Sequence, residues 1–394
     1  MRAAVLFDMF GPYHVARMHA LGLRADVLAI EVSSRSSTYA WAASRGSFSF
    51  KRATLFEADD SSAISTAELS FRLCRALSRF SPKVAFIPGW SARAPLIALR
   101  HCLRLGVPTV VMSESTEHDQ RRTLVTETVK RRVVRKFSSA LVGGTPHAAY
   151  LRTLGFPHSL IHLGYDVVDN DYFKIGAAAA REDAAETRRK YMLPDRYFLA
   201  SSRLVGIKNL PVLLTAFQEF LRRSKGSDAR LVVLGDGSER LALERLAANL
   251  NIGARLLMPG FIQYADLPAY YGLATAFVHV SRTEPWGLVV NEAMASRLPV
   301  VVSRNCGCST DLVIDRENGF LVDHDDPSAI ASALSLLDSD PETRRVMGVN
   351  GERIISAWNC DRFARGAMAA SASALASGAR DYDLECSLLM RALI

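Results

Sequence analysis

Short apolar runs alternate with stretches of helical periodicity along most of the chain, and this alternation limits the fold more than any other feature. The apolar runs in the first half lie at residues 3–7, 26–31, 84–87, 109–112 and 140–142. Those in the second half lie at 198–201, 231–234, 255–258, 276–280 and 300–303. Runs of this kind, separated by helices, are typical of parallel strands covered on both faces. The sequence therefore predicts an α/β protein with two doubly wound, Rossmann-like sheets.

The length supports two domains rather than one. The chain has 394 residues, 49% hydrophobic and 22% charged, a composition that excludes disordered and fibrous proteins. Two domains of about 150 to 200 residues fit this length better than one core. We expect an N-terminal domain over residues 1–175, a second domain over 176–360, and a helical segment over 361–394 that packs back on the first. The small and charged stretch 176–190 is interpreted as the connector.

Positive charge is concentrated in the first half. Residues 1–170 hold 22 Lys and Arg against 13 Asp and Glu, whereas the remaining residues hold 26 against 27. Part of the excess lies in Lys130, Arg131, Arg132, Arg135 and Lys136. The segment 126–137 also spaces Val129, Val133, Val134 and Phe137 as in an amphipathic helix. Such a helix binds an anionic membrane surface or lies as a solvated surface helix. No nucleic-acid-binding motif accompanies it, so we expect no nucleic-acid partner.

Cysteine usage and hydropathy bear on the compartment. The six cysteines have no disulfide or zinc spacing, which favours reduced thiols in a cytosolic protein. The apolar start is too short for a secretory signal, and no stretch approaches the roughly 18 apolar residues of a membrane span. We expect a cytoplasmic protein, either free or peripheral on the membrane.

Two loops of the second half carry candidate phosphate ligands. Ser202, Arg203 and Lys208 follow the run at 198–201, and ligands of open parallel sheets bind beyond the carboxyl ends of strands. A guanidinium and an ammonium suit a pyrophosphate, and two solvated loop cations are the alternative. Gly235-Asp236-Gly237 follows the next run, where glycines allow close backbone approach. Ser238 is the expected cap of the helix after it.

Two glutamates seven residues apart form the sharpest motif. Glu284 precedes Pro285, which keeps it out of the following helix, and Gly287 opens that helix. The free N–H groups of a helix start favour an anion. Glu292 lies about one turn into the helix. Carboxylates accept hydrogen bonds from sugar hydroxyls, so the pair suits a phosphate flanked by sugars, whereas acidic residues that complement a helix dipole are the alternative.

Taken in order, these motifs resemble those of the retaining glycosyltransferases of family four, which have the GT-B fold. The resemblance is strong over about 195–340 and fainter at Gly164-Tyr165-Asp166. Its blocks are Arg203, Lys208-Asn209, Gly235-Asp236-Gly237, Gly260-Phe261, residues 281–287, Glu292-Ala293 and Asn318-Gly319. The GT-B fold implies two Rossmann-like domains that face a central cleft, with a C-terminal helix crossing back to the first. The first domain would take the acceptor and the second the nucleotide sugar.

The resemblance also implies roles for single residues. Arg203 and Lys208 would neutralise the donor diphosphate, and Glu284 would bind the transferred sugar; these three are the catalytic candidates. Glu292 would hold the ribose. The other donor-binding candidates are Gly11, Ser202, Gly235, Gly237, Phe261, Ile262, Gly287, Leu288 and Val289. No metal or other cofactor is implied, because cations and a helix end supply the positive charge.

The N-terminal domain departs from the family's pattern. The family commonly has a Gly-Gly loop after the first strand, and here Pro12 replaces the second glycine and removes an N–H donor. The family's later sugar-contacting histidine has no obvious counterpart. The acceptor-side candidates are Tyr13, His14, Arg17, Glu114 and His118.

The resulting hypothesis is a retaining, metal-independent transfer of a sugar from a nucleoside diphosphate to an acceptor hydroxyl. The expected acceptor is a glycan or lipid-linked saccharide in polysaccharide or glycolipid assembly. One alternative is a soluble transferase that makes a small glycoside or disaccharide. Another is a non-catalytic regulator that binds nucleotide sugars.

Overall fold

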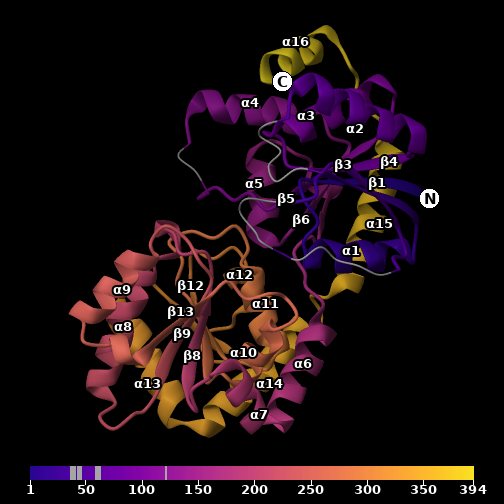
Figure 1. The fold of residues 1–394 in the computed structure, drawn as a ribbon. Helices are drawn as coiled ribbons and strands as arrows, with labels where there is room; N and C mark the ends of the chain where they lie inside the picture. The colour runs from indigo at the N-terminus through magenta and orange to yellow at the C-terminus, as the bar shows by residue number, and fades with distance from the viewer. Residues whose placement is uncertain (36–40, 42–46, 58–63, 120–121) are drawn as a thin grey trace. The chain divides into compact units, whose positions relative to one another are not determined.

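Two parallel β-sheets, each with helices on both faces, organise the chain (Figure 1). The structure is a computed structural model that describes residues 1–35, 41, 47–57, 64–119 and 122–394. It divides into a first unit, Met1–Val167 with Cys360–Ile394, and a second unit, Val168–Asn359. The predicted α/β class with two doubly wound sheets is confirmed.

The first unit has seven parallel strands in the order β3-β2-β1-β4-β5-β6-β7. The strands are β1 (Arg2–Phe7), β2 (Asp26–Ser33), β3 (Lys51–Phe56), β4 (Val84–Pro88), β5 (Thr109–Ser113), β6 (Ser139–Val142) and β7 (Ile161–Leu163). The helices are α1 (Pro12–Gly22), α2 (Thr66–Phe80), α3 (Arg93–Arg104), α4 (Leu124–Val134), α5 (Thr145–Thr153), α15 (Cys360–Ser377) and α16 (Leu384–Leu393). Successive β1 residues alternate between two buried clusters, one with α2 and α3 and the other with α1 and α15.

The end of the chain belongs to the first unit. Helix α15 packs on α1 and on β6, where the Ser139 hydroxyl donates to the Ala370 carbonyl oxygen at 2.7 Å. A Cβ on Gly366 would lie 2.4 Å from the Leu163 oxygen, so this glycine lets α15 approach β7 closely. The final residues, for which the sequence predicts no element, form α16.

The second unit has six parallel strands in the order β10-β9-β8-β11-β12-β13. The strands are β8 (Tyr197–Ser201), β9 (Arg230–Leu234), β10 (Leu256–Gly260), β11 (Ala276–His279), β12 (Val300–Ser303) and β13 (Gly319–Val322). The helices are α6 (Asn170–Glu182), α7 (Ala184–Tyr191), α8 (Leu210–Arg223), α9 (Arg240–Asn249), α10 (Leu267–Leu273), α11 (Leu288–Ala295), α12 (Ser309–Leu312), α13 (Pro327–Ser339) and α14 (Pro341–Ile355).

The stretch 176–190 is helical, so its interpretation as a connector is wrong. Phe173, Ala177 and Ala180 recur at helical spacing and are buried, which gives α6 an apolar face. Gly176 and Gly272 let α6 and α10 pack closely, since a Cβ on either would lie within 3 Å of the other helix. The second unit begins at Val168, and the expected domain limit at residue 175 therefore lies inside α6.

Candidate functional site

Four loops meet at the carboxyl edge of the second sheet. They follow β8, β9, β11 and β12, and backbone hydrogen bonds join them. The Leu204 amide donates to the Asp236 oxygen at 2.9 Å, and the Arg282 amide to the Ile207 oxygen at 2.9 Å. The Gly307 amide donates to the Glu284 oxygen, also at 2.9 Å. The candidate donor residues of three separate sequence motifs thus lie on one connected surface.

The glycines after β9 are explained by this close packing. Gly235 has a φ of +115°, and a Cβ there would lie 1.9 Å from the Ser202 carbonyl oxygen. A Cβ on Gly237 would lie 2.5 Å from the Leu204 oxygen. Both glycines are therefore required for the contact between loops, whatever ligand they bind. The expected cap at Ser238 is wrong, because α9 begins at Arg240 with Glu239 in the cap position.

Lys208, Glu284 and His279 form a charged network at this edge. Glu284 Oε2 forms an ion pair with Lys208 and lies 3.0 Å from His279 Nε2. The Ser281 hydroxyl lies 3.2 Å from the same histidine nitrogen. The side chains of Lys208 and Glu284 are each 13% exposed, so the pair is largely shielded but still reaches solvent.

Burial and the neighbouring charges act in opposite directions on this network. Burial alone would lower the pKa of His279, but hydrogen bonds to Cys306 and Glu284 raise it to about 9. Burial alone would raise the pKa of Glu284, but His279 and Lys208 lower it to about 2. Burial alone would also raise the pKa of Cys306, but its hydrogen bonds to Cys308 and His279 lower it to about 6. At neutral pH the network therefore places the cations of Lys208 and His279 beside the carboxylate of Glu284 and the thiolate of Cys306, near the start of α11.

The start of α11 is built around Gly287. This residue has a φ of +97°, and a Cβ would lie 2.8 Å from the Cys306 sulfur. Trp286, 1% exposed, fixes the turn by donating from Nε1 to Asn291 Oδ1 at 2.9 Å. The candidates Leu288 and Val289 are half-buried in the first turn of the helix. The first N–H groups of a helix have no intrahelical partner, so this turn can bind an anion.

The remaining donor candidates differ in exposure. Glu292 is fully buried and accepts a hydrogen bond from the Tyr271 hydroxyl at 2.6 Å. Arg203 is exposed, whereas Ser202, Phe261 and Ile262 are half-buried. The loop that carries Phe261 joins the site through the Gly235 amide, which donates to the Gly260 oxygen at 2.8 Å. Their roles toward base and ribose stay predictions.

The candidate residues in and after the loop that follows β1 already contact other residues of the first unit. The Gly11 amide donates to His14 Nδ1 at 3.0 Å, so this N–H already has a partner. Burial lowers the pKa of His14 to about 3, helped by the nearby Arg17, and the ring is neutral. Tyr13 is half-buried and packs edge-on against Trp41, with ring centroids 6.3 Å apart. Arg17 is 1% exposed, which gives it a supporting position below the surface.

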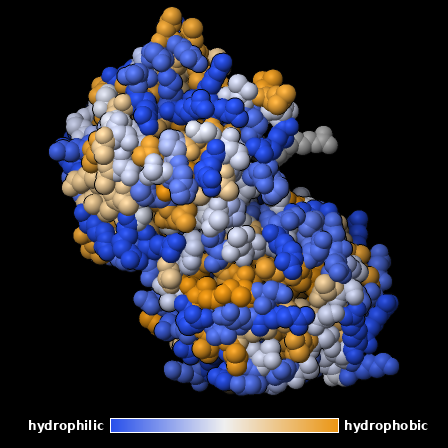
Figure 2. Space-filling model, turned by 180° about the vertical axis from the view of Figure 1, so that it is seen from behind, coloured by the Kyte–Doolittle hydropathy of each residue, from blue (hydrophilic) through white to orange (hydrophobic). Residues whose placement is uncertain are grey.

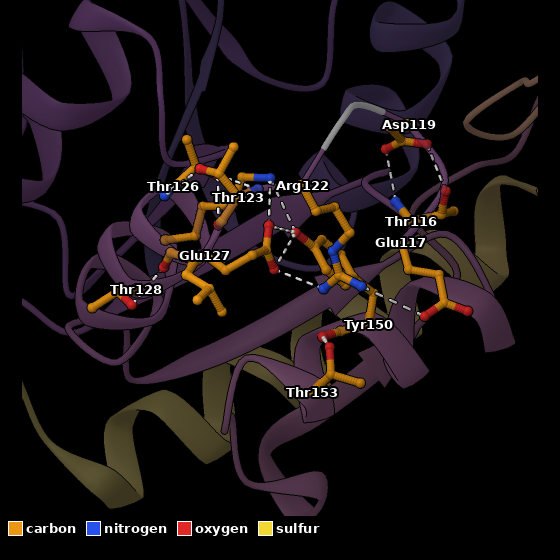
Figure 3. A network of polar contacts seen from close by, with 12 residues as sticks. Thr116, Glu117, Asp119, Arg122, Thr123, Thr126, Glu127, Thr128, Tyr150 and Thr153 are labelled. Atoms are coloured by element: carbon orange, nitrogen blue, oxygen red, sulfur yellow. Dashed lines mark hydrogen bonds and ion pairs between the residues drawn. The ribbon is translucent and has the colours of Figure 1, made fainter.

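The two acceptor-side candidates after β5, Glu114 and His118, differ in their exposure to solvent. Glu114 is half-buried directly after the strand, whereas His118 is exposed and lies 3.4 Å from Glu117. Ion pairs connect this loop to α4 (Figure 3). Glu117 and Glu127 both contact Arg122, at 3.7 and 2.7 Å. Glu127 also accepts from Lys130 and from the Tyr150 hydroxyl, each at 3.1 Å.

The basic segment differs from its expected form. Val133, Val134 and Phe137 are buried in the core of the first unit, so the apolar face of α4 points inward. Lys130 pairs with Glu127, and Lys136 pairs with Asp383 at 3.0 Å. Three arginines of the segment are exposed, namely Arg131, Arg132 and Arg135. Leu124 and Val125 at the start of α4 are 90% and 73% exposed.

Other apolar side chains also reach the surface of the first unit. Leu384 and Leu388 of α16 are 77% and 57% exposed, and Figure 2 shows orange surface over this helix at the top of the molecule. Within the described residues, no helix combines the length and apolar character needed to cross a membrane.

Residues 183–354 match the model of one protein family, the glycosyl transferases of group 1. The match covers less than half of the chain and lies within the second unit. The matched residues contain the whole charged network at the edge of the second sheet.

Curated proteins similar to this chain include two with named activities. A GDP-mannose-dependent alpha-(1-6)-phosphatidylinositol monomannoside mannosyltransferase of Mycolicibacterium smegmatis is 32% identical over 54% of the chain and 55% of its own length. The alpha-D-kanosaminyltransferase of Streptomyces kanamyceticus is 31% identical over 62% of the chain and 65% of its own length. The matches thus span about half to two thirds of these relatives.

Solved structures extend the likeness over nearly the whole chain. Sucrose-phosphate synthase of Thermosynechococcus elongatus has a TM-score of 0.72 at 19% identity and covers 92% of this chain and 96% of its own. Anabaena HepE, solved with UDP and glucose, has a TM-score of 0.73 at 17% identity, with coverages of 93% and 98%. These likenesses show that the chain has the GT-B fold.

Sequence reasoning missed one member of this network. No motif of the sequence singles out His279, yet its ring contacts Glu284. Its position held the only available signal, because it is the last residue of β11 and so lies at the ligand-binding edge. Tyr271 also lies beside a candidate residue, since its hydroxyl donates to Glu292, and no local motif predicts this.

Proposed function

We propose that the chain is a retaining glycosyltransferase that transfers a sugar from a nucleoside diphosphate sugar to an acceptor hydroxyl, without a metal ion. The observation that carries the proposal is the network of Lys208, Glu284 and His279 at the start of α11. It combines a positive charge for a diphosphate with a carboxylate for sugar hydroxyls.

Each part of the network has a role in such a transfer. The leaving nucleoside diphosphate gains negative charge as the glycosidic bond breaks, and fixed positive groups stabilise that charge. Lys208 and the first N–H groups of α11 supply them, and Arg203 adds an exposed guanidinium. Glu284 neutralises Lys208 in the free protein, so an arriving diphosphate competes for the ammonium. His279 then keeps Glu284 ionised while its carboxylate accepts from the sugar.

The acceptor is proposed to be a lipid-linked saccharide or glycolipid on the cytoplasmic face of a membrane. The named substrate of the M. smegmatis relative, phosphatidylinositol monomannoside, is of this class. A surface for it is offered by Leu124 and Val125 beside the exposed arginines of α4. The alternative of a small soluble glycoside stays open and is decided by the acceptors that support turnover.

The donor is tested by thermal shift against UDP-, GDP-, ADP- and dTDP-sugars, because a ligand that binds the native state raises its melting temperature. With the donor found, release of nucleoside diphosphate is followed with and without acceptor, in EDTA. We expect slow release of the nucleoside diphosphate with water and rapid release with acceptor. NMR of the product should show that the anomeric configuration of the donor sugar is retained. Binding without any turnover would favour the non-catalytic regulator instead.

The network is tested with Lys208→Ala and a matched control, Lys225→Ala, whose lysine is exposed in the loop before β9. Loss of one charge-stabilising donor typically costs about 100- to 1,000-fold in turnover. We expect a loss of this size for Lys208→Ala and none for the control. Equal rates in both variants would contradict the proposed role of Lys208.

Membrane contact is tested by vesicle sedimentation. We expect binding to anionic vesicles and little to neutral ones, with a loss of binding at high salt because the charges are screened. Replacing Arg131, Arg132 and Arg135 by Gln should abolish the difference between the vesicles. Equal recovery in the supernatant with both vesicle types would contradict membrane contact.

A further inference from the structure

A groove at the outer end of the first sheet belongs to none of the sites described above. It lies between α2 and β3, the end strand of the sheet, and has a volume of about 680 Å³. Leu28 of β2 and Ala53 and Leu55 of β3 form its floor, and α2 forms one wall. Leu28 and Ala53 are half-buried, whereas Ala85 of β4, in the same apolar cluster, is 2% exposed. Helix α2 therefore leaves this end of the sheet partly uncovered.

The wall of this groove is strongly basic. Arg72, Arg75 and Arg79 recur on α2 at spacings of three and four residues, so they form a row about 10 Å long. Arg2 lines the groove from the start of β1. Among the lining residues that the structure describes, Glu68 is the only acidic one. The groove thus has an excess of three positive charges.

Two of the four arginines have acidic partners and two do not. Arg72 pairs with Glu68 at 2.6 Å, and Arg2 lies 3.8 Å from a carboxylate of β2. Arg75 and Arg79 make no hydrogen bond or ion pair within the described part of the chain. Only Arg79 lies in the last turn of α2, where a cation also complements the helix dipole. Like charges one turn apart destabilise a helix, so the row costs the free protein stability that an anionic partner restores.

Apolar side chains continue from the floor of the groove onto its wall. Phe71 of α2 is 60% exposed, and Phe80 lies at the other end of the helix, with its ring centroid 4.6 Å from the Arg2 guanidinium. A partner must therefore offer an apolar strip next to an acidic strip. In an extended chain neighbouring side chains point in opposite directions, so they cannot face the floor and the wall together. Two adjoining stripes of a helix can, and they repeat at the spacing of the arginine row.

We propose that this basic groove binds an acidic amphipathic helix of a partner protein, which lies beside α2 on the end of the first sheet. The apolar stripe of the partner covers Leu28 and Ala53, as in other complexes of a helix in a groove. Its carboxylates pair with Arg75 and Arg79, whose planar guanidinium groups match carboxylate geometry. Parallel sheets are usually covered by helices on both faces, and the docked helix completes this cover over β3. The inference does not depend on the proposed transfer.

Binding is tested with the whole chain and two labelled peptides of about 18 residues, long enough to form a helix. Both peptides repeat leucine at helical spacing, and the positions beside the leucines are glutamate in one peptide and lysine in the other. We expect fluorescence anisotropy to show at least tenfold tighter binding of the glutamate peptide, and weaker binding at high salt because the charges are screened. Equal affinity for the two peptides, or no binding of the glutamate peptide, would overturn the proposal.

The arginine row is tested with the double variant Arg75→Gln, Arg79→Gln. The control, Arg152→Gln with Arg222→Gln, removes two exposed arginines of α5 and α8 and so changes the net charge equally. We expect the glutamate peptide to bind at least tenfold more weakly to the first variant and unchanged to the control, with folding of both checked by thermal melting. Equal affinities of the two double variants would overturn the role of the row.

Charge reversal and hydrogen exchange locate the contact. The double variant Arg75→Glu, Arg79→Glu should prefer the lysine peptide, because the wall is then acidic. In the wild type, the glutamate peptide should slow amide hydrogen exchange in β3 and α2. A reversed variant that still prefers the glutamate peptide, or slowed exchange in other elements alone, would overturn the proposed site.

A lipid surface and a second copy of the chain are the other occupants that a basic groove fits. Sedimentation with anionic vesicles and analytical ultracentrifugation of the chain alone are therefore repeated with Arg75→Gln, Arg79→Gln. We expect the variant to match wild type in vesicle binding and in oligomeric state. A loss of vesicle binding would assign the groove to lipid, and a loss of self-association would assign it to a second copy. Either result would overturn the proposal.

Discussion

Replacing Glu284 by glutamine should change how the stability of the protein depends on pH above neutrality. Glu284 is the carboxylate partner of His279, whose pKa is raised from an ordinary 6.5 to about 9. A raised pKa stabilises the folded state fully below 6.5, and this contribution is lost as the pH rises through about 9. The contribution of His279 to wild-type stability should therefore fall between these values, while that of Cys306, whose pKa is lowered to about 6, rises over about the same range and opposes it.

The size of this fall follows from the same values. At about 1.4 kcal/mol for each pKa unit, a shift from 6.5 to about 9 corresponds to about 3 kcal/mol. The His279 side chain is 4% exposed, so solvent screening reduces this little. The pKa of Glu284, lowered to about 2, describes the same pair, and its contribution is present above 4.5 and lost only as the pH falls toward 2. The two contributions are therefore not added.

In Glu284→Gln, His279 loses its carboxylate partner but keeps Cys306, the other group that raises its pKa, so the pKa falls only part of the way back. We expect the variant to be less stable than wild type by about 1–2 kcal/mol at pH 6, and the difference to shrink to below about 1 kcal/mol near pH 9.5. Urea unfolding from pH 5.5 to 9.5 measures both curves. Glu244→Gln, which removes a half-exposed partner of Arg240, is the control and should run parallel to wild type. A constant difference between Glu284→Gln and wild type across this range would refute the reasoning.

Three further substitutions test the packing around the sites. Gly287→Ala and its control Gly226→Ala both place a side chain at a φ above +90°, but only the Cβ at position 287 would lie 2.8 Å from a sulfur atom. In urea unfolding, Gly287→Ala should therefore lose about 1–3 kcal/mol more stability than Gly226→Ala does. Burial alone would raise the pKa of Glu127, but its hydrogen-bond donors lower it to about 2, so its contribution to stability is lost as the pH falls through that value. Glu127→Gln should therefore lower the free energy of unfolding by about 1–3 kcal/mol at pH 7 and by little at pH 2. Gly272→Ala should lower the melting temperature, since its Cβ would lie 2.8 Å from a backbone oxygen of α6; an unchanged midpoint would show that the two helices move apart freely.

The central strands were predictable from the sequence, whereas the two edge strands of the first sheet, β3 and β7, were not. A central parallel strand is buried on both faces, so β4, β5, β8 and β12 read as continuous apolar runs. At the edges, β3 begins Lys51-Arg52 and is only partly buried, and β7 is three half-buried residues long. Such strands are defined by pairing with a neighbour, which no local pattern reports. The interpretation of 176–190 as a connector was wrong for a related reason, because its alanines and Gly176 form a buried helix surface only when they pack against α10.

The site was predictable where its chemistry is local in sequence. The spacing of Glu284, Gly287 and Glu292 predicts a loop followed by the start of a helix. In the structure Glu284 lies in the loop, Gly287 caps α11 and Glu292 lies inside the helix. The pairing of Lys208 with Glu284 joins loops far apart in the chain, and the ion pair of Arg17 with Asp166 likewise joins distant segments. Asp166 was visible in the sequence only as part of a faint motif. Burial raises its pKa, and the tertiary fold alone creates that burial.

Buried charge at the edge of the second sheet suggests a last test of what the network serves. A buried ion pair often stabilises a fold no better than well-packed apolar residues of similar size, whereas removing one partner alone leaves an uncompensated charge. Lys208→Met should therefore destabilise the protein by about 1–3 kcal/mol, less than a fully isolated charge would cost because His279 still contacts Glu284. The double variant Lys208→Met with Glu284→Met should recover most of this loss in urea unfolding, yet bind no donor in the thermal-shift assay. A double variant that binds donor as wild type does would show that the network serves the fold alone.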